Sequence, residues 1–359
     1  MLARGDPGCD RWAGACEEQQ EEREEHLADY RRIVVKAHAG LPVAYDDVLA
    51  ARETIGDKLR RTPTFSSATL SRRSGAPVAL KAELFQRTGS FKPRGMLNVV
   101  AHLSADEKQR GVITISAGNA AQSLAYCAAL EGIDCLVVMW QGVSESKLAA
   151  TREYGAEVDL EAPAPAEAFE RLKRLQEETG RVYVHSFDDP RLIAGHGTLG
   201  FELLEDVPDL NTVVVPIGGG GLISGIATAV KGARPDTRIV GIEPELSPAM
   251  HLALEAGEPV PVEPRSIADG LNAPFAGENT LALCRALVDE LVLVTEEEIY
   301  EAFRLLYGRA KLACEPAGAV ATAALLAGKL GLDGSGTTVA VVSGGNVAPR
   351  TAVAILAEE

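Results

Sequence analysis

The sequence has no apolar run of the 18 or so residues that a membrane-spanning helix requires. Aromatic residues make up only 5% of the chain, and its six cysteines form no C-x-x-C pair. A disulfide scaffold and a paired-cysteine metal site are therefore not expected, and the cysteines are predicted to be reduced thiols. The N-terminus carries charges where a signal peptide needs an apolar core, so the expected location is the cytoplasm.

Basic residues are scarce as well. The 35 Lys and Arg residues stand against 51 Asp and Glu residues, which gives a formal charge of −16 and argues against a nucleic-acid partner. An anionic small molecule is still compatible with this charge, because backbone dipoles at a helix N-terminus can hold an anion locally. Glycine has no three-residue period, and no heptad repeat of apolar residues is sustained, so a collagen helix and a coiled coil are excluded. The 46% hydrophobic content is that of a globular protein.

The first 42 residues differ from the rest of the chain. Residues 17–25 read EEQQEEREE, a run that is typical of a solvated helix or a disordered tail. We therefore interpret residues 1–42 as an acidic N-terminal extension.

From about Val43 onward, short β-branched runs alternate with helical segments. Most of the runs are apolar on both faces, as strands covered by helices on either side must be. This alternation predicts an α/β fold with parallel sheets. The predicted strands are Val78–Lys81, Val112–Ser116, Cys135–Met139, Val182–His185, Thr212–Ile217, Arg238–Ile242, Leu291–Thr295 and Thr338–Ser343. The predicted helices include Ala120–Leu130, Leu222–Val230 and Glu296–Ala313, the last opened by a capping box of Thr295 and Glu298.

In such folds ligands bind where strands end and helices begin, and one such junction is rich in glycine. The segment VVPIGGGGLIS leads from an apolar strand through Gly218, Gly219, Gly220 and Gly221 into a helix. Consecutive glycines let the backbone approach a ligand and direct several N–H groups at it, which favours a phosphate. The spacing fits neither the dinucleotide fingerprint G-x-G-x-x-G nor the P-loop, and a tight turn is the alternative reading.

A second junction carries a lysine. In ELFQRTGSFKPRG, Lys92 precedes Pro93, which suits the first turn of a helix. The positive end of a helix disfavours a protonated amine, so this lysine is a candidate nucleophile. An ordinary surface lysine is the alternative.

Two further junctions offer polar groups. SAGNAAQ (Ser116–Gln122) can present backbone N–H groups to a carboxylate and an amide to a ligand oxygen, or it is a capped helix start. SGGN (Ser343–Asn346) places a hydroxyl at the end of the last apolar strand, or it is a plain turn.

Taken together, the four junctions suit an aromatic aldehyde phosphate that bonds covalently to a lysine. They resemble those of the fold-type II pyridoxal-phosphate enzymes, in particular the serine/threonine dehydratases and the serine racemases. The resemblance runs from about Val43 to Ile355 and includes IAGHGTLGFELLED, SIADGL and CEPAGA. It implies two open twisted parallel-sheet domains of the tryptophan synthase β type. Residues 43–110 and 189–359 would form a large cofactor-binding domain, and residues 111–188 a small mobile domain that closes over the substrate.

The resemblance also implies roles for individual residues. Lys92 would bond to pyridoxal 5′-phosphate and act as the catalytic base. The cofactor phosphate would be bound by Gly218, Gly219, Gly220, Gly221 and Leu222. Asn119 would contact the phenolic oxygen, and Ser343 would face the pyridine nitrogen. Phe91 and Gly270 would flank the two faces of the ring. The substrate carboxylate would be held by Ser116, Ala117, Gly118, Asn119 and Ala120.

The reaction that the resemblance implies is the β-elimination of water from L-threonine or L-serine, which gives a 2-oxo acid and ammonia. Serine, threonine and a bulkier β-hydroxy amino acid all remain open, because one methyl group is worth only about 1–3 kcal/mol in a pocket. Serine racemases carry a serine where Ala117 stands, and alanine cannot transfer a proton, so efficient racemisation is not expected. Ala120 stands where a histidine is common in the family.

Other readings stay open. A β-replacement enzyme like cysteine synthase is disfavoured by SAGNAAQ, and a non-enzymatic binding module is disfavoured by Lys92. Glu243 and Ser247 resemble two residues of the family's divalent-metal site, but Ala249 falls where a carboxylate is expected, so the residues do not predict a metal there. A divalent or a monovalent cation elsewhere stays open. A homodimer is the family expectation. A C-terminal regulatory domain is not expected, because the chain stops at Glu359 soon after SGGN.

Overall fold

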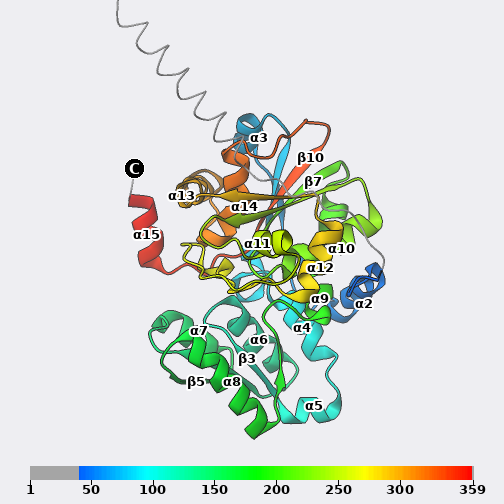
Figure 1. Ribbon diagram of the computed structural model, residues 1–359. Helices are drawn as coiled ribbons and strands as arrows, with labels where there is room; N and C mark the ends of the chain where they lie inside the picture. Colours follow the sequence, from blue (N-terminus) through cyan, green and yellow to red (C-terminus); the bar gives the residue numbers. More distant parts are fainter. Residues whose placement is uncertain (1–39, 358–359) are drawn as a thin grey trace, which may run out of the picture. The chain divides into compact units, whose positions relative to one another are not determined.

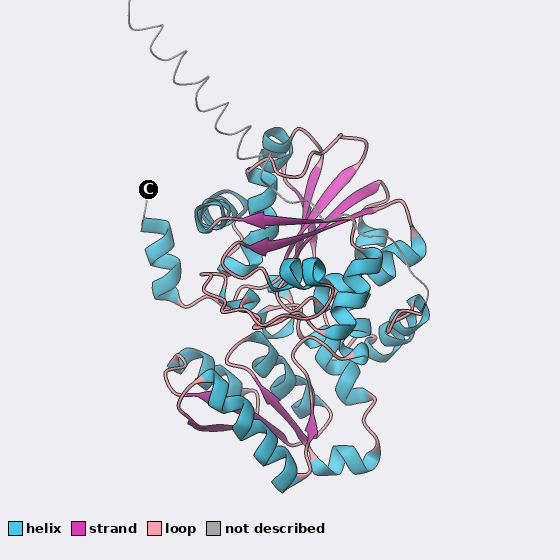
Figure 2. Ribbon diagram, viewed as in Figure 1, coloured by secondary structure: helices cyan, strands magenta, loops and turns pink. Residues whose placement is uncertain are grey.

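Two separate β-sheets organise the structure, a computed structural model that describes residues 40–357 (Figures 1 and 2). The larger sheet has six strands in the order β1-β2-β10-β7-β8-β9, and the smaller has four in the order β5-β4-β3-β6. The expectation of an α/β fold with two parallel sheets is therefore confirmed. The acidic segment at residues 17–25 lies outside the described residues, as does nearly all of the extension predicted for residues 1–42.

The larger sheet is parallel except at one edge. There β1 pairs antiparallel with β2, with Thr64 opposite Lys81. Alternate residues of each central strand point to opposite faces, so Val213 and Val215 pack into one core and Val214 into the other. The strands are β1 (Thr64–Ser66), β2 (Val78–Ala82), β7 (Leu210–Pro216), β8 (Arg238–Pro244), β9 (Glu290–Val294) and β10 (Thr337–Val342).

Helices cover both faces of this sheet. One core joins it to helices α3 (Ala68–Ser74), α13 (Glu296–Leu305), α14 (Pro316–Leu326) and α15 (Pro349–Ala357). The other joins it to α9 (Pro190–Asp206), α10 (Gly221–Ala233), α11 (Ala249–Ala256) and α12 (Glu278–Leu287). Helix α2 (Tyr45–Ile55) packs against α9. Burial of apolar surface on both sides explains why the strands are almost uninterrupted in Val and Ile.

The smaller sheet takes its strands from a single stretch of the chain. These are β3 (Val112–Ile115), β4 (Cys135–Trp140), β5 (Glu157–Ala162) and β6 (Val182–Tyr183), all parallel. Helices α4 (Pro93–Ala101) and α6 (Asn119–Leu130) cover one face, and α8 (Pro165–Thr179) covers the other. Helices α5 (Ala105–Arg110) and α7 (Glu145–Glu153) complete this part of the chain, which Figure 1 shows apart from the larger sheet.

The structure adds two strands to the eight predicted ones and shortens one helix. Strand β5 alternates acidic and apolar residues at a sheet edge, and β1 has only three residues, so neither carries a strong apolar signal. The capping box of Thr295 and Glu298 is present, but α13 ends at Leu305. A π-helical turn follows, and Lys311 then adopts a left-handed φ of 62°, which ends the helical path before Ala313.

The composition predicts reduced thiols and no membrane-spanning helix, and both can be examined within residues 40–357. The four cysteines within residues 40–357 are free thiols and buried. None of the helices described is long and apolar enough to cross a bilayer.

Candidate active site

The four junctions singled out in the sequence lie at the carboxyl ends of strands. Ser343 follows β10, the glycine segment follows β7, Ser116 follows β3, and the chain leads from β2 through two short 3-10 turns to Lys92. The Phe91 N–H donates to the Ser343 carbonyl at 3.1 Å, and the Gly345 N–H donates to the Gly89 carbonyl at 2.9 Å. These bonds hold the segment before Lys92 against the turn after β10.

Lys92 is the residue that immediately precedes α4, with Pro93 as the first residue of the helix. Its Nζ donates to the Ser186 carbonyl at 2.8 Å and lies 5.1 Å from the centre of the Phe91 ring. Burial lowers the pKa of this amine to about 8, although the nearby Glu315 carboxyl acts in the opposite direction. A lysine with such a pKa supplies a substantial fraction of neutral amine near neutral pH, as a nucleophile or base requires.

The glycine segment forms the turn from β7 into α10, and it is packed too tightly for side chains. A Cβ on Gly219 would lie 2.3 Å from the Phe187 ring, and one on Gly221 would lie 2.6 Å from the Phe187 carbonyl. Gly220 has a φ of +94°, which favours glycine. The chain therefore enters α10 as backbone without side chains. The first N–H groups of this helix lack intrahelical acceptors, as a site for an anion requires.

One segment that sequence reasoning did not single out joins Lys92 to this turn. Ser186 accepts the lysine's hydrogen bond, and the next residue, Phe187, packs on the glycines. The Ser186 hydroxyl donates to the Ile115 carbonyl at 3.2 Å, and Asp188 accepts from the Thr280 N–H at 3.0 Å. The signal that could have found this segment is its position, because it follows the predicted strand Val182–His185.

Asn119 is the first residue of α6, and both the nitrogen and the oxygen of its side-chain amide form hydrogen bonds. Its Nδ2 donates to Glu315 at 2.7 Å, and its Oδ1 accepts from Asn346 Nδ2 at 2.7 Å. Glu315 is buried, and burial raises the pKa of its carboxyl to about 7, with Asp269 adding to the rise. Glu315 belongs to the quoted segment CEPAGA, but the sequence alone assigned it no role.

The remaining cofactor residues lie around this amide. A Cβ on Gly270 would lie 3.9 Å from Asn119 Nδ2 and 3.1 Å from the Ala317 Cβ. The Ser343 hydroxyl is buried and is 3.5 Å from the carbonyl oxygen of the same alanine. A Cβ on Gly218 would lie 3.1 Å from the Cα of Leu271, the residue after Gly270. The structure therefore brings Phe91, Lys92, Asn119, Gly270, Ser343 and the glycine segment into one region.

The β3–α6 turn supplies the predicted carboxylate loop. The Gly118 N–H donates to the Ser116 hydroxyl at 3.1 Å, and a Cβ on Gly118 would meet no atom within 4 Å. Ala117 is half-buried and Ala120 is buried. The open side of this turn is compatible with a small ligand.

Glu243 lies near the carboxyl end of β8, and Ser247 lies in the turn between β8 and α11. The Glu243 carboxylate accepts from the Met250 and His251 N–H groups, each at 2.8 Å, and the Ser247 hydroxyl donates to the Leu271 carbonyl. Burial raises the pKa of Glu243 to about 8. Among residues 40–357 there is no group of three or more His, Cys, Asp or Glu side chains placed to hold a metal.

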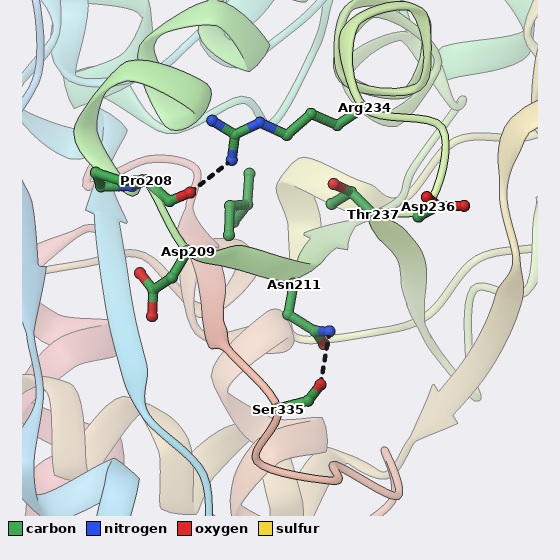
Figure 3. Close-up of a pocket in the computed structure, with 8 residues that line it drawn as sticks. Pro208, Asp209, Asn211, Arg234, Asp236, Thr237 and Ser335 are labelled. Atoms are coloured by element: carbon green, nitrogen blue, oxygen red, sulfur yellow. Dashed lines mark hydrogen bonds between the residues drawn. The ribbon is translucent and has the colours of Figure 1, made fainter.

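A hollow of about 400 Å³ lies at the other ends of the large-sheet strands, next to the starts of β7, β8 and β10 (Figure 3). Its Arg234 guanidinium donates to the carbonyls of Pro208 and Leu204, and Asn211 donates to Ser335. None of the predicted site residues lines it.

Comparison with known proteins gives concordant results. The family model described as "Pyridoxal-phosphate dependent enzyme" matches residues 55–344. The L-threonine ammonia-lyase of Thermotoga maritima is 44% identical over 306 residues, which cover 85% of this chain and 76% of the relative. The T.th. threonine deaminase is 40% identical with a TM-score of 0.79, covering 85% of this chain and 99% of that one. Maize serine racemase is 35% identical with a TM-score of 0.83, covering 86% and 95%.

Proposed function

Because this chain belongs to the pyridoxal-phosphate dependent enzyme family, we propose that it eliminates water from L-threonine or L-serine, releasing a 2-oxo acid and ammonia. The observation that carries the proposal is the half-buried amine of Lys92, whose pKa burial lowers to about 8. It lies at a helix start and donates to Ser186, whose neighbour Phe187 packs on the turn of glycines. The names of the Thermotoga maritima and T.th. proteins support threonine as a substrate.

The residues present fit pyridoxal phosphate. The glycine turn has no room for a Cβ at Gly219, Gly220 or Gly221, so backbone alone lines it, and its helix N-terminus suits a phosphate. We propose that Gly218–Leu222 hold the phosphate, that Asn119 faces the phenolic oxygen and Ser343 the pyridine nitrogen, and that Phe91 and Gly270 flank the ring. When bound, this cofactor supplies an electron sink for the bond broken at the substrate's Cα.

The chain's own residues would then divide the work. Lys92 Nζ would hold the cofactor covalently at rest, and the substrate's amine would displace it. The freed Nζ, whose low pKa favours the neutral form, would then take the proton from the substrate's Cα. The N–H groups of the Ser116–Ala120 turn would bind the substrate carboxylate and fix its orientation. The 111–188 segment would close over the substrate and exclude water.

Racemisation is the main competing activity, and the likeness to maize serine racemase favours testing it. Inversion at Cα needs a proton donor on the face opposite the lysine. Serine racemases carry a serine where Ala117 stands in this chain, and alanine offers no such proton. We therefore propose that elimination is much faster than racemisation.

We further propose that no divalent cation at Glu243 is needed, because two backbone N–H groups already satisfy that carboxylate. Activity retained after chelation supports this, and activity restored only by added magnesium or calcium contradicts it. A cytoplasmic homodimer is proposed from the family resemblance alone. Light scattering on the purified chain tests the dimer.

The deciding experiment combines binding and turnover. The chain incubated with pyridoxal phosphate should absorb at roughly 410–420 nm, and borohydride reduction followed by peptide mapping should label Lys92. A panel of L-threonine, L-serine and bulkier β-hydroxy amino acids, read by 2-oxo acid formation, identifies the substrate. Lys92→Ala should lose at least about 10²–10⁴-fold in turnover. A colourless, inactive wild-type chain would sink the proposal, and cysteine formed from sulfide and O-acetylserine would redirect it to β-replacement.

A further inference from the structure

Five residues form a closed ring of hydrogen bonds and ion pairs that joins β2, α4 and α9, and the ring closes through the backbone carbonyl of Thr62. Lys81 Nζ contacts Glu202 at 2.7 Å, and Glu202 in turn accepts from Arg94 Nη1 at 2.7 Å. Arg94 pairs with Glu83, the Thr62 hydroxyl donates to Glu83, and the Thr62 carbonyl accepts from Lys81 at 2.8 Å. The four charges alternate in sign around the ring, so it is neutral as a whole.

Arg94 is the member with the most demanding geometry. Its Nε and Nη2 donate to the two oxygens of Glu83 at 2.8 and 2.9 Å, while Nη1 reaches Glu202 on another helix. Its side chain is only 2% exposed, and Glu83 is fully buried. Burial alone raises the pKa of Glu83, but Arg94, together with Thr62 and Lys81, outweighs this effect and holds the pKa of the carboxyl below its usual value. Only a planar guanidinium satisfies two carboxylates at once in this way.

This ring acts on the first turn of α4, the turn that begins at Lys92. Arg94 follows Lys92 by two residues, and its N–H donates to the Phe91 carbonyl at 3.1 Å. The next N–H, that of Gly95, donates to the Nδ1 of the buried His196 on α9 at 3.1 Å. Arg94 and Gly95 therefore fix the first turn of α4 to η1 (Glu83–Phe85) and to α9.

We propose that Arg94 is a positioning residue for Lys92, and that the closed ring holds the amine at its catalytic place. The inference rests on the proposed function of Lys92. A displacement of about 1 Å in a reacting group can cost about 100-fold in rate, so the ring need only prevent small rotations of the turn. A purely structural ring would instead affect folding without affecting the amine.

A pair of carboxylates on α9 separates the two possibilities. Glu202 contacts both Lys81 and Arg94, whereas Asp206, one helical turn later, contacts Lys81 at 3.0 Å and not Arg94. Glu202→Gln and Asp206→Asn each remove one negative charge next to the same buried lysine. Only the first loosens Arg94. Arg94→Lys is a third variant, which keeps the positive charge but loses the guanidinium that donates to both Glu83 and Glu202.

The full chain is tested in two states. Without cofactor, Lys92 is labelled with acetic anhydride across pH 7–10 and quantified by mass spectrometry, with the exposed Lys173 as internal reference. With cofactor, kcat and KM are measured, and thermal unfolding is followed for every variant.

We expect Glu202→Gln and Arg94→Lys to move the labelling midpoint of Lys92 upward, because the loosened amine reaches solvent. We expect kcat to fall about 10- to 100-fold while KM stays within about threefold. Asp206→Asn should lower the unfolding temperature but keep the wild-type midpoint and kcat. Equal midpoints and equal kcat values in Glu202→Gln and Asp206→Asn would overturn the proposal, and that pair decides even where Arg94→Lys does not fold. The labelling arm stands without any turnover, so an error in the proposed substrate shows up separately.

Discussion

The Nζ of Lys92 lies 2.8 Å from the carbonyl oxygen of Ser186 and donates a hydrogen bond to it. The lysine sits at the start of α4, while Ser186 follows the last strand of the smaller sheet and precedes α9. A backbone carbonyl accepts a hydrogen bond without carrying a full opposite charge, so it orients the amine and leaves burial free to lower its pKa. The Ser186–Phe187 segment thus joins the lysine to the glycine turn.

The first prediction concerns the pH dependence of Lys92 in the cofactor-free chain. Its pKa of about 8 lies below the ordinary lysine value of 10.5, so the neutral amine gains population as pH rises and predominates above about pH 8. Labelling by acetic anhydride should rise about tenfold per pH unit below that point and level off above it. Mass spectrometry of the Lys92 peptide measures the rate. A rate that continues to rise to pH 10 would show that the amine is not desolvated.

The sequence predicts the site residues that come directly after a strand. The junctions at Lys92, Asn119, Gly218–Gly221 and Ser343 were all found by that rule, and the structure gathers them. Their roles remain predictions. Ser186 and Phe187 follow a strand too, but a carbonyl acceptor and an apolar ring have no residue-type signal, so only the fold reveals them.

Long-range pairing explains the other gaps. Glu315 is 196 residues from Asn119, and neither its burial nor its bond to that amide is visible in CEPAGA. Strand β5 reads EVDLEA, whose polar alternation is weak evidence for a strand until β4 is known to lie beside it. The ring around Arg94 likewise joins residues as far apart in the chain as Thr62 and Glu202.

The second prediction tests the glycine turn. Gly219→Ala places a methyl group 2.3 Å from the Phe187 ring, so the ring must move and carry Ser186 with it. Overpacking of this kind costs about 1–3 kcal/mol, and we expect the affinity for pyridoxal phosphate to fall at least about tenfold. Titration of the cofactor absorbance measures the affinity. Gly308→Ala is the matched control, since a Cβ there meets no atom within 4 Å and should leave binding unchanged. Equal affinities in both variants would place the phosphate elsewhere.

The third prediction adds a missing proton donor. Ala117→Ser places a hydroxyl in the half-buried turn after β3, at the position where serine racemases carry serine. We expect the D-serine formed from L-serine to increase at least about tenfold, since acid–base groups typically contribute about 10²–10⁴-fold. Chiral chromatography detects the product. Ala117→Gly, which changes the side chain without adding a proton donor, should show no gain. If the serine variant also shows none, the second face of Cα is served by another group.

The fourth prediction concerns Glu315 and tests its hydrogen bond to Asn119. Burial, with a contribution from Asp269, raises the pKa of Glu315 to about 7, so the side chain is neutral below that pH and ionised above it. Asn119 Nδ2 donates more strongly to a carboxylate than to a neutral acid, so the amide is held best above pH 7. Lys92 and Lys147 also face this carboxyl, and both favour its ionised form.

We therefore expect kcat to rise with pH through about 7 in the wild type. Glu315→Gln keeps a side chain that can accept from Asn119 but cannot ionise, so this limb of the profile should disappear and kcat should stay near the wild-type value at acidic pH. Steady-state kinetics between about pH 5.5 and 8.5 measure the limb, with circular dichroism to verify folding. A wild-type-like limb in the glutamine variant would assign the titration to another group, and Lys92 would then be the first to examine.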